Sequence, residues 1–438
     1  MTAPYLAEFT KFSGNGASAE PAWLRETRRA GIEKFAELGF PTPRNEDWHF
    51  TSVAPIAEAT FSPLRGASGQ IARSELAPFQ FGQSAWPLLV FVNGRYDASL
   101  STPGALAKGI RALDLATALR NEPALVEPWL GKLSPVQDRS FSALNAAFMS
   151  DGAVIHIAPD TAAPIPLHLI FVSDANAAKG VAHLRNLIVA GRNSKATVIE
   201  SYVSLGDSHY FTNAVTEVQV DAGATLTHYK IQRESQRAFH VHTIDTKQAR
   251  DSHYVSFSFA TGGALSRTNI YTNLAGEGCG ATLNGLYMGD DEQHVDHQTN
   301  IIHSQPNCFS REIYKGILSG SAHGVFNGKV YVYPIAQKTD GKQTNNNLLL
   351  SERARIDTKP QLEIFADDVR CTHGATVGRL DEMALFYMKS RGVSTDKATR
   401  LLTYAFAADV LETIEVEAVR TELERATLER FTGASVAL

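Results

Sequence analysis

Between residues 150 and 375 the chain alternates short apolar runs with polar or glycine-containing corners. Runs such as AVIHIAP, PIPLHLIFV and KATVIESYVSL are rich in β-branched and aromatic residues, and each is short enough to form one strand. Almost no helical spacing interrupts these runs over about 220 residues. The pattern therefore predicts a mainly β region in the middle of the chain.

A weak internal repeat indicates how these strands stack. The motifs KATV and GATL place alanines at Ala196, Ala224 and Ala281, so the second interval is close to twice the first. A period of roughly 28 residues is typical of a solenoid, in which each rung buries its apolar face against the next rung. The alternative is a β-sandwich in which the motif recurs by chance.

Helical spacing is confined to the two ends of the chain. Near the N-terminus Leu24, Ile32, Phe35 and Leu38 share one face of a predicted helix, and Gly39 is a typical stop.

After residue 380 the run DEMALFYMKSR ends before Gly392, and Ser394 is a candidate N-cap with Asp396 in the first turn. The segment 401–411 that follows is apolar on nearly all sides, so it is either buried in its own domain or shared with a partner.

These patterns divide the chain into four parts. The expected divisions are an N-terminal helical region at 1–85, a mixed lead-in at 86–149, a β-helix core at 150–377 and a C-terminal helical domain at 378–438.

Composition narrows the class of protein. A net charge of −5, with Lys and Arg scattered, does not suggest a nucleic-acid binder. The N-terminus lacks the pattern of a signal peptide, and no run of 18 apolar residues predicts a membrane span. The chain has three cysteines, Cys279, Cys308 and Cys371, which lie far apart and form no C-x-x-C motif. This spacing fits a protein of the reducing cytosol. Three thiolates are also fewer than the four that a permanent iron–sulfur cluster normally takes from one chain. We therefore expect a cytoplasmic protein.

Histidine offers two candidate metal clusters. His240 and His242 are two residues apart on an expected strand, so they point the same way. The second cluster is His294, Asp296, His297 and His303. Either could serve a metal-dependent β-helix enzyme acting on a polysaccharide-like polymer; the structural alternative is that they are hydrogen-bonded polar residues.

The stretch DDVRCTHGAT carries a third candidate site. Cys371 and His373 share one side of an extended strand, and both residue types are common metal ligands. Neighbouring Arg370 is expected to favour the thiolate. Two ligands cannot close a tetrahedral site, so another subunit or another rung would have to supply the rest.

The block from Lys338 to Gly392 that contains this stretch resembles the SufB/SufD family of SUF iron–sulfur cluster scaffold subunits, and its SufD branch in particular. The resemblance extends to NEDWHFTS at 45–52, to SALNAAFMSDGAVIHIAP at 142–159 and to HSQPNCFSREIYKGIL at 303–318. It implies a flattened right-handed parallel β-helix flanked by helical domains at both ends.

The resemblance also implies a function and partners. The chain would be a non-catalytic scaffold subunit that pairs with a SufB-like subunit through its last rungs and docks a SufC-like ATPase through its C-terminal helices. Cys371 and His373 would help to hold a transient nascent cluster at the subunit interface, with no permanent cofactor. The residues expected to dock the ATPase are Tyr387, Arg391, Tyr404 and Phe406.

Two expectations stand beside this assignment. Cys308 is interpreted as a lone structural thiol in a β run. An open β edge invites pairing, so the isolated chain is expected to form an end-to-end homodimer. The chain could also be a pure assembly element, with the cluster held wholly by the sister subunit.

Overall fold

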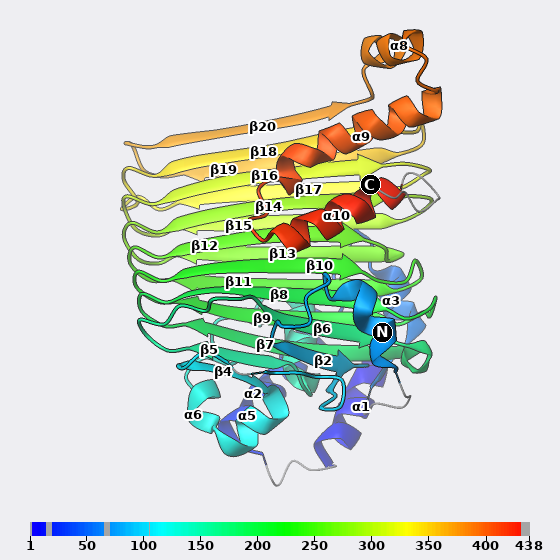
Figure 1. Ribbon diagram of the computed structural model, residues 1–438. Helices are drawn as coiled ribbons and strands as arrows, with labels where there is room; N and C mark the ends of the chain where they lie inside the picture. Colours follow the sequence, from blue (N-terminus) through cyan, green and yellow to red (C-terminus); the bar gives the residue numbers. More distant parts are fainter. Residues whose placement is uncertain (1, 15–19, 65–70, 105, 431–438) are drawn as a thin grey trace.

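Two facing β-sheets form the body of the protein (Figure 1). The computed structural model describes residues 2–14, 20–64, 71–104 and 106–430. From β5 to β20 successive strands alternate between the two sheets, and each strand pairs in parallel with the next strand but one. This is a parallel β-solenoid with helices at both ends, so the predicted fold class is confirmed.

Each sheet has ten strands within the described residues. Sheet A contains β1 (Ser62–Pro63), β4 (Ile110–Asp114), β5 (Ala153–Ile157), β7 (Gly180–Ala190), β9 (Phe211–Val220), β11 (Phe239–Gln248), β13 (Leu265–Leu274), β15 (His294–His303), β17 (His323–Val332) and β19 (Arg355–Ile364). Sheet B contains β2 (Leu88–Val92), β3 (Arg95–Tyr96), β6 (Leu167–Ser173), β8 (Lys195–Ser204), β10 (Thr225–Arg233), β12 (His253–Thr261), β14 (Gly280–Gly289), β16 (Phe309–Leu318), β18 (Asp340–Leu349) and β20 (Arg370–Gly378).

The period of the repeat found in the sequence agrees with the length of a rung, but the three alanines that defined the repeat do not all occupy the same position in their rungs. Ala196 lies beside Leu226, Leu226 beside Tyr254, and Tyr254 beside Ala281. Ala281 is therefore equivalent to Ala196 three rungs earlier, whereas Ala224 precedes its strand and belongs to a corner. The reason is that the corners vary in length, so the rungs are not of equal length.

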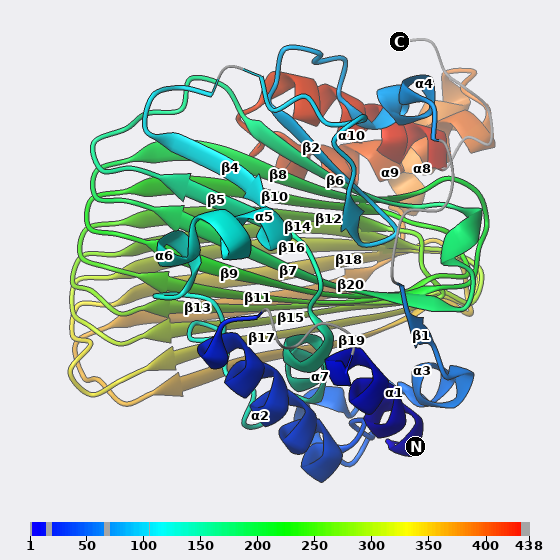
Figure 2. The same ribbon diagram turned by 90° about the horizontal axis from the view of Figure 1, so that it is seen from below.

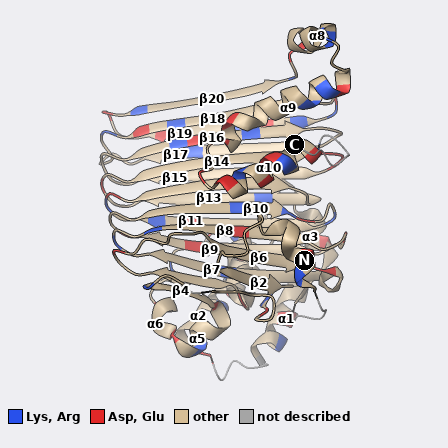
Figure 3. Cartoon of the chain, in the orientation of Figure 1, with Lys and Arg blue, Asp and Glu red and all other residues tan. Residues whose placement is uncertain are grey.

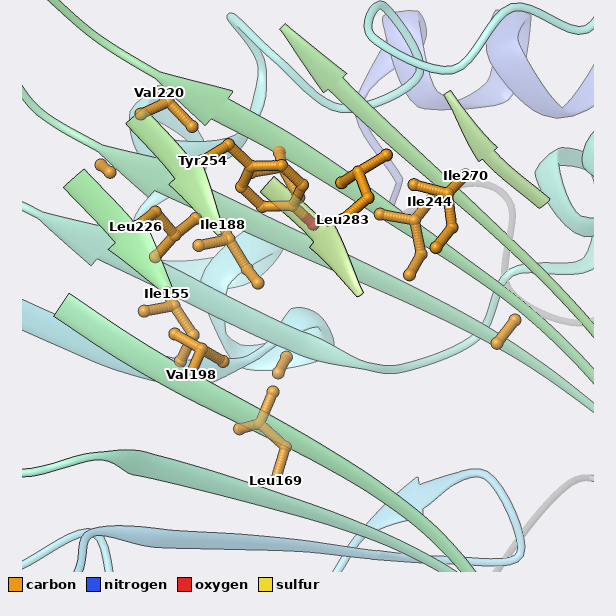
Figure 4. Packing of buried hydrophobic residues seen from close by; sticks show 14 of the residues in the cluster. Ile155, Leu169, Ile188, Val198, Val220, Leu226, Ile244, Tyr254, Ile270 and Leu283 are labelled. Atoms are coloured by element: carbon orange, nitrogen blue, oxygen red, sulfur yellow. The ribbon is translucent and has the colours of Figure 1, made fainter. Parts of the chain in front are cut away.

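The core lies between the two sheets. Alternate side chains of each strand point inward, as the period of a β-strand requires. Figure 4 shows Ile188, Ile244 and Ile270 of sheet A meeting Val198 and Leu283 of sheet B. These side chains are almost wholly buried, and the burial of apolar area at about 25 cal/mol per Å² makes this layer the main source of stability.

Most of the N-terminal helices cover the outer face of sheet A (Figure 2), whereas the short helix at Arg73–Leu76 packs on the outer face of sheet B, against Val90 and Ile170. Gly31 lets two of them, α2 and α7, approach closely, because a Cβ there would lie 2.8 Å from the Ala143 carbonyl oxygen. The predicted N-terminal helix is confirmed, and it stops at Gly39, whose N–H donates to the Phe35 carbonyl at 2.9 Å. The helices of this half are α1 (Ala3–Gly14), α2 (Ala22–Leu38), α3 (Ala54–Ala59), α4 (Arg73–Leu76), α5 (Leu115–Asn121), α6 (Pro123–Val126) and α7 (Ser140–Phe148).

The helices described after the last strand are α8 (Glu382–Ser390), α9 (Thr395–Leu411) and α10 (Glu417–Arg430). Ser394 caps α9 as predicted, accepting from the Lys397 N–H at 3.3 Å. Helices α9 and α10 pack against the outer face of sheet B, where Val410 and Leu411 are fully buried. No helix in the described part of the chain is both long and apolar enough to cross a membrane.

A buried ion pair joins the solenoid to the segment before it. Charged residues of both signs are spread over the strands and C-terminal helices (Figure 3). Among them, Arg185 and Glu217 form an ion pair whose side chains are both fully buried. The Arg185 Nε donates to Glu217 Oε1 at 2.8 Å, and Glu217 also accepts the backbone N–H groups of Gly131, Leu133 and Ser134. One carboxylate thus fixes the preceding loop on sheet A.

Replacing Arg185 by alanine should be strongly destabilising, because it leaves Glu217 charged and buried without its cation. We expect a loss of about 3–5 kcal/mol in the free energy of unfolding, measured by urea denaturation. Arg192→Ala is the matched control: Arg192 pairs with Asp160 at 3.0 Å on an exposed corner, and such pairs contribute about 0–1 kcal/mol. Equal losses in the two variants would contradict this account.

Candidate functional site

Cys371 and His373 lie on β20, the last strand of sheet B. Their register partners on β18 are Gly341 and Gln343; both residues are buried, and the Gln343 side chain points into the solenoid. Cys371 and His373 therefore also face inward, but no later strand within the described residues covers them. Cys371 is half-buried and His373 is exposed. The sequence correctly placed the two side chains on one side of a strand.

The Cys371 thiol sits in a gap left by a glycine. A Cβ added at Gly341 would lie 3.4 Å from the Cys371 Sγ and 3.5 Å from the Ser310 Oγ. The Cys371 side chain packs against an apolar cluster that includes Val330 of sheet A, and Leu362 packs against the same cluster. The pair is thus seated on the inner wall of the solenoid near its open end.

The electrostatic setting of the thiol differs from the expectation. Burial raises the pKa of Cys371, a hydrogen bond with the Gly341 backbone lowers it by less, and the negative charge of Asp340 adds a small further rise. Arg370 does not counter this, because adjacent residues on a strand point to opposite faces. The expectation that Arg370 favours the thiolate is therefore wrong, and the protonated thiol is favoured in the isolated chain.

The polar floor beneath the pair continues into the solenoid. Gln343 donates from Nε2 to Glu312 Oε2 at 2.7 Å. Burial raises the pKa of Glu312 to about 7, despite the opposing hydrogen bonds from Thr299 and Gln343. These groups bind one another, so they do not supply His373 with a third ligand from below.

The site is incomplete within the described part of this chain. Among those residues, no group of three or more His, Cys, Asp or Glu side chains is placed to hold a metal ion. Cys371 and His373 could bind a metal or cluster only if another molecule completed the coordination.

The first histidine cluster serves the interior of the solenoid. His240 and His242 point the same way, as predicted; both face the interior of the solenoid and are fully buried. The His240 Nδ1 lies 2.7 Å from Glu234 Oε2, and the His242 Nε2 lies 3.7 Å from Glu200 Oε2. Both imidazoles therefore pair with buried carboxylates, and the structural interpretation describes them better than a metal site.

The second histidine cluster is divided between two faces of β15. His297 and His303 point inward, where the His303 Nε2 lies 3.0 Å from the Ser310 Oγ. His294 and Asp296 point outward and both contact the Thr51 hydroxyl, at 2.8 and 2.6 Å. The cluster predicted from the sequence does not form, because residues an odd number apart on a strand face opposite ways.

The four residues expected on the docking surface have different surroundings. Tyr387 is 60% exposed on α8, and Arg391 donates to its hydroxyl at 3.2 Å. Phe406 on α9 instead packs under the Lys315 ammonium, which lies 4.6 Å from its ring centre and donates to its carbonyl. Tyr404 is half-buried on the same helix. The breadth of the apolar surface of α9 is thus explained largely by packing inside the chain.

Helix α8 carries an exposed apolar surface at this end, and two of its residues were not predicted from the sequence. Met383 and Phe386 are 73% and 68% exposed, beside Tyr387. Positions i, i+3 and i+4 share one face of a helix, so the spacing could have identified this face. Figure 1 shows that α8 stands away from the strands.

Comparison with known proteins gives a consistent result over nearly the whole chain. The family model described as "SUF system FeS cluster assembly, SufBD core domain" matches residues 171–406, and the "SufBD protein N-terminal region" matches residues 2–169. The chain is 33% identical to the iron-sulfur cluster assembly protein SufD of Escherichia coli over 92% of each chain. It is 29% identical to SufD of Bacillus subtilis, over 92% of this chain and 93% of that one.

The raised pKa of Cys371 should show in its reactivity. We expect the rate of alkylation of Cys371 to rise with pH to a midpoint above the value of about 8.5 for a free cysteine. Peptide mass spectrometry separates this residue from the two buried cysteines. Asp340→Asn should move the midpoint to lower pH, because it removes a negative charge near the thiol. A midpoint below that of the unfolded chain would overturn the assignment.

Proposed function

The chain belongs to the SufBD family of iron–sulfur cluster assembly proteins, and from this premise we propose that it is a non-catalytic scaffold subunit that shares a nascent cluster with a SufB-like partner. The observation that carries the proposal is the position of Cys371 and His373: two candidate ligands at the unpaired end of the solenoid, with no third ligand placed beside them among the described residues. We place the assembly in the cytoplasm as part of the same proposal.

The open end is a suitable surface for pairing with the sister subunit. Strands β19 and β20 end their sheets, so each presents one row of unpaired backbone groups. Apolar side chains are also exposed there, including Val377 at 50% and Phe365 at 54%. A partner with a similar open end could pair with these strands and cover these side chains.

The same surface favours self-pairing when the partner is missing. A second copy of the chain presents the same edge, so an end-to-end homodimer would cover the strands of both copies. Such a dimer would bring two Cys371 thiols and two His373 imidazoles to one interface.

In this proposal the cluster is cargo. Thiolate and imidazole are ligands of iron–sulfur clusters, and the partner supplies the remaining ligands. The raised pKa of Cys371 means that binding iron must displace its proton. Cargo binding should therefore weaken as the pH falls.

A SufC-like ATPase would dock on the C-terminal helices. Met383, Phe386 and Tyr387 form an apolar face on α8 that remains exposed in the described structure. Clusters of exposed aromatic residues are typical of the central part of a protein interface. We propose that α8 supplies the main contact, with Arg391 beside it and the exposed edge of α9 next to it.

Co-expression of the chain with its SufB-like and SufC-like partners tests the cluster site. We expect Cys371→Ala/His373→Ala to assemble at wild-type yield on size exclusion but to lose most of the iron and sulfide measured under anaerobic conditions. Both replacements remove ligand atoms from half-buried or exposed positions, so they should not disturb the fold.

Thr372→Ala is the matched control, because Thr372 lies between the two ligands and points to the other face of β20. It should retain iron and sulfide. If the double variant assembles and also retains its cluster, the partner holds the cargo alone and this chain is a pure assembly element.

The dock on α8 is tested separately. Phe386→Glu/Tyr387→Glu should weaken binding of the ATPase by at least about 2 kcal/mol, a roughly thirty-fold rise in Kd, measured by titration calorimetry. Ile165→Glu introduces a single glutamate at an apolar residue that is 39% exposed elsewhere on the chain, and it should leave the Kd unchanged. An unchanged Kd in the α8 variant would exclude this helix as the dock.

A further inference from the structure

Cys279 and Cys308 occupy the same place in successive rungs. Each immediately precedes a strand of sheet B, and these strands, β14 and β16, pair from their first residues, Gly280 and Phe309. The Phe309 N–H donates to the Cys279 carbonyl at 3.0 Å, and the Asp340 N–H donates to the Cys308 carbonyl at 3.0 Å. The two cysteines are therefore direct neighbours across the ladder, and Cys308 is not the lone thiol that the sequence indicated.

Both thiols are buried and lie close to backbone carbonyl oxygens of the corners. Cys279 and Cys308 are 0% and 1% exposed. The Cys279 Sγ lies 3.0 Å from the Ala249 carbonyl oxygen, and the Cys308 Sγ lies 3.3 Å from that of Gly276. Only corner backbone separates this pair from solvent on one side, since Gly276 and its neighbours at 275–278 are half-buried.

The spacing of neighbouring rungs suits a covalent bond. Adjacent strands lie about 4.8 Å apart, and disulfides join residues whose Cα atoms are about 4.4–6.8 Å apart. We propose that Cys279 and Cys308 form a redox-active dithiol that closes to a disulfide between two rungs when it meets a peroxide. This inference does not depend on the proposed function.

The two thiols have different parts in the reaction. The contact between the two thiols lowers the pKa of Cys279 and raises the pKa of Cys308. Cys279 is thus the nucleophile, because the thiolate is the reactive form, and Cys308 is the resolving thiol.

The chemistry balances with hydrogen peroxide as the oxidant. The Cys279 thiolate attacks one peroxide oxygen, the O–O bond breaks, and hydroxide leaves to take up a proton as water. The Cys308 sulfur then attacks the sulfenic sulfur, the S–S bond forms, the S–O bond breaks, and a second water leaves. Two thiols lose two electrons and two protons, and one peroxide becomes two waters.

The pair lies along the corner that leads to Cys371. The column of residues that precede the strands of sheet B continues from Cys308 to Thr339 and Val369, two residues before Cys371. A disulfide would therefore fix the rungs beneath the candidate cluster site. It would record exposure to an oxidant without using the Cys371 thiol.

The test uses the full chain with Cys371→Ser, so that only the two paired thiols remain. The protein is treated with hydrogen peroxide, unfolded in N-ethylmaleimide and digested without reductant. We expect the number of alkylated thiols to fall from two to zero, a cross-linked peptide joining Cys279 to Cys308 to appear, and dithiothreitol to reverse both changes. If both cysteines stay alkylatable at peroxide concentrations that oxidise a free thiol in the same solution, the proposal fails.

Two serine variants separate the roles and guard against misfolding. Serine should fit the column, because Ser252 and Thr339 occupy the same position in neighbouring rungs, and thermal melting checks this. In Cys308→Ser, dimedone should trap a sulfenic acid at Cys279, since no resolving thiol is present. In Cys279→Ser, trapping at Cys308 should be slower, because burial still raises the pKa of the Cys308 thiol when Cys279 is absent. Equal trapping in the two variants would overturn the assigned roles.

Discussion

Every strand of the solenoid depends on the rungs before and after it for its backbone hydrogen bonds, so the ladder must be stopped at each end. At the N-terminal end the antiparallel strands β3 and β4 and the neighbouring helices stop it. At the other end β19 and β20 are the last strands of their sheets in the described chain. Because an uncovered edge exposes both backbone groups and inner side chains, this end is where Cys371 and His373 become available to another molecule.

The interior of the solenoid contains many buried polar and charged side chains, and for this reason the histidine clusters in the sequence did not indicate a metal site. His228 and His242 face the Glu200 carboxylate, and Lys230 donates to the Thr268 hydroxyl at 3.0 Å. Burial lowers the pKa of Lys230 to about 7, against the opposing charges of Glu234 and Glu200. Buried polar groups need partners, and in the described chain these residues lie beside one another inside the solenoid.

Stacking of rungs also brings together residues that are distant in sequence. Phe239 lies beside Leu265, and His323 lies beside Arg355. The second pair is separated by more residues than the first, so the rung that begins at His323 is longer than the rung that begins at Phe239. Corner lengths set this difference. The separation of Cys279 and Cys308 matches one rung, but this could be recognised only once the corners were known.

The sequence by itself determined the features that depend on neighbouring residues. Alternating apolar runs defined the strands, and the recurrence of similar motifs indicated the solenoid. Gly39 and Ser394 marked helix ends. Because Cys371 and His373 are two residues apart on a strand, the sequence also placed them on one face. Tertiary structure alone decided which rungs coincide, which face of α9 is buried, and why the pKa of Cys371 is raised. These depend on corner lengths and on contacts between distant segments such as Lys315 and Phe406, for which local patterns carry no signal.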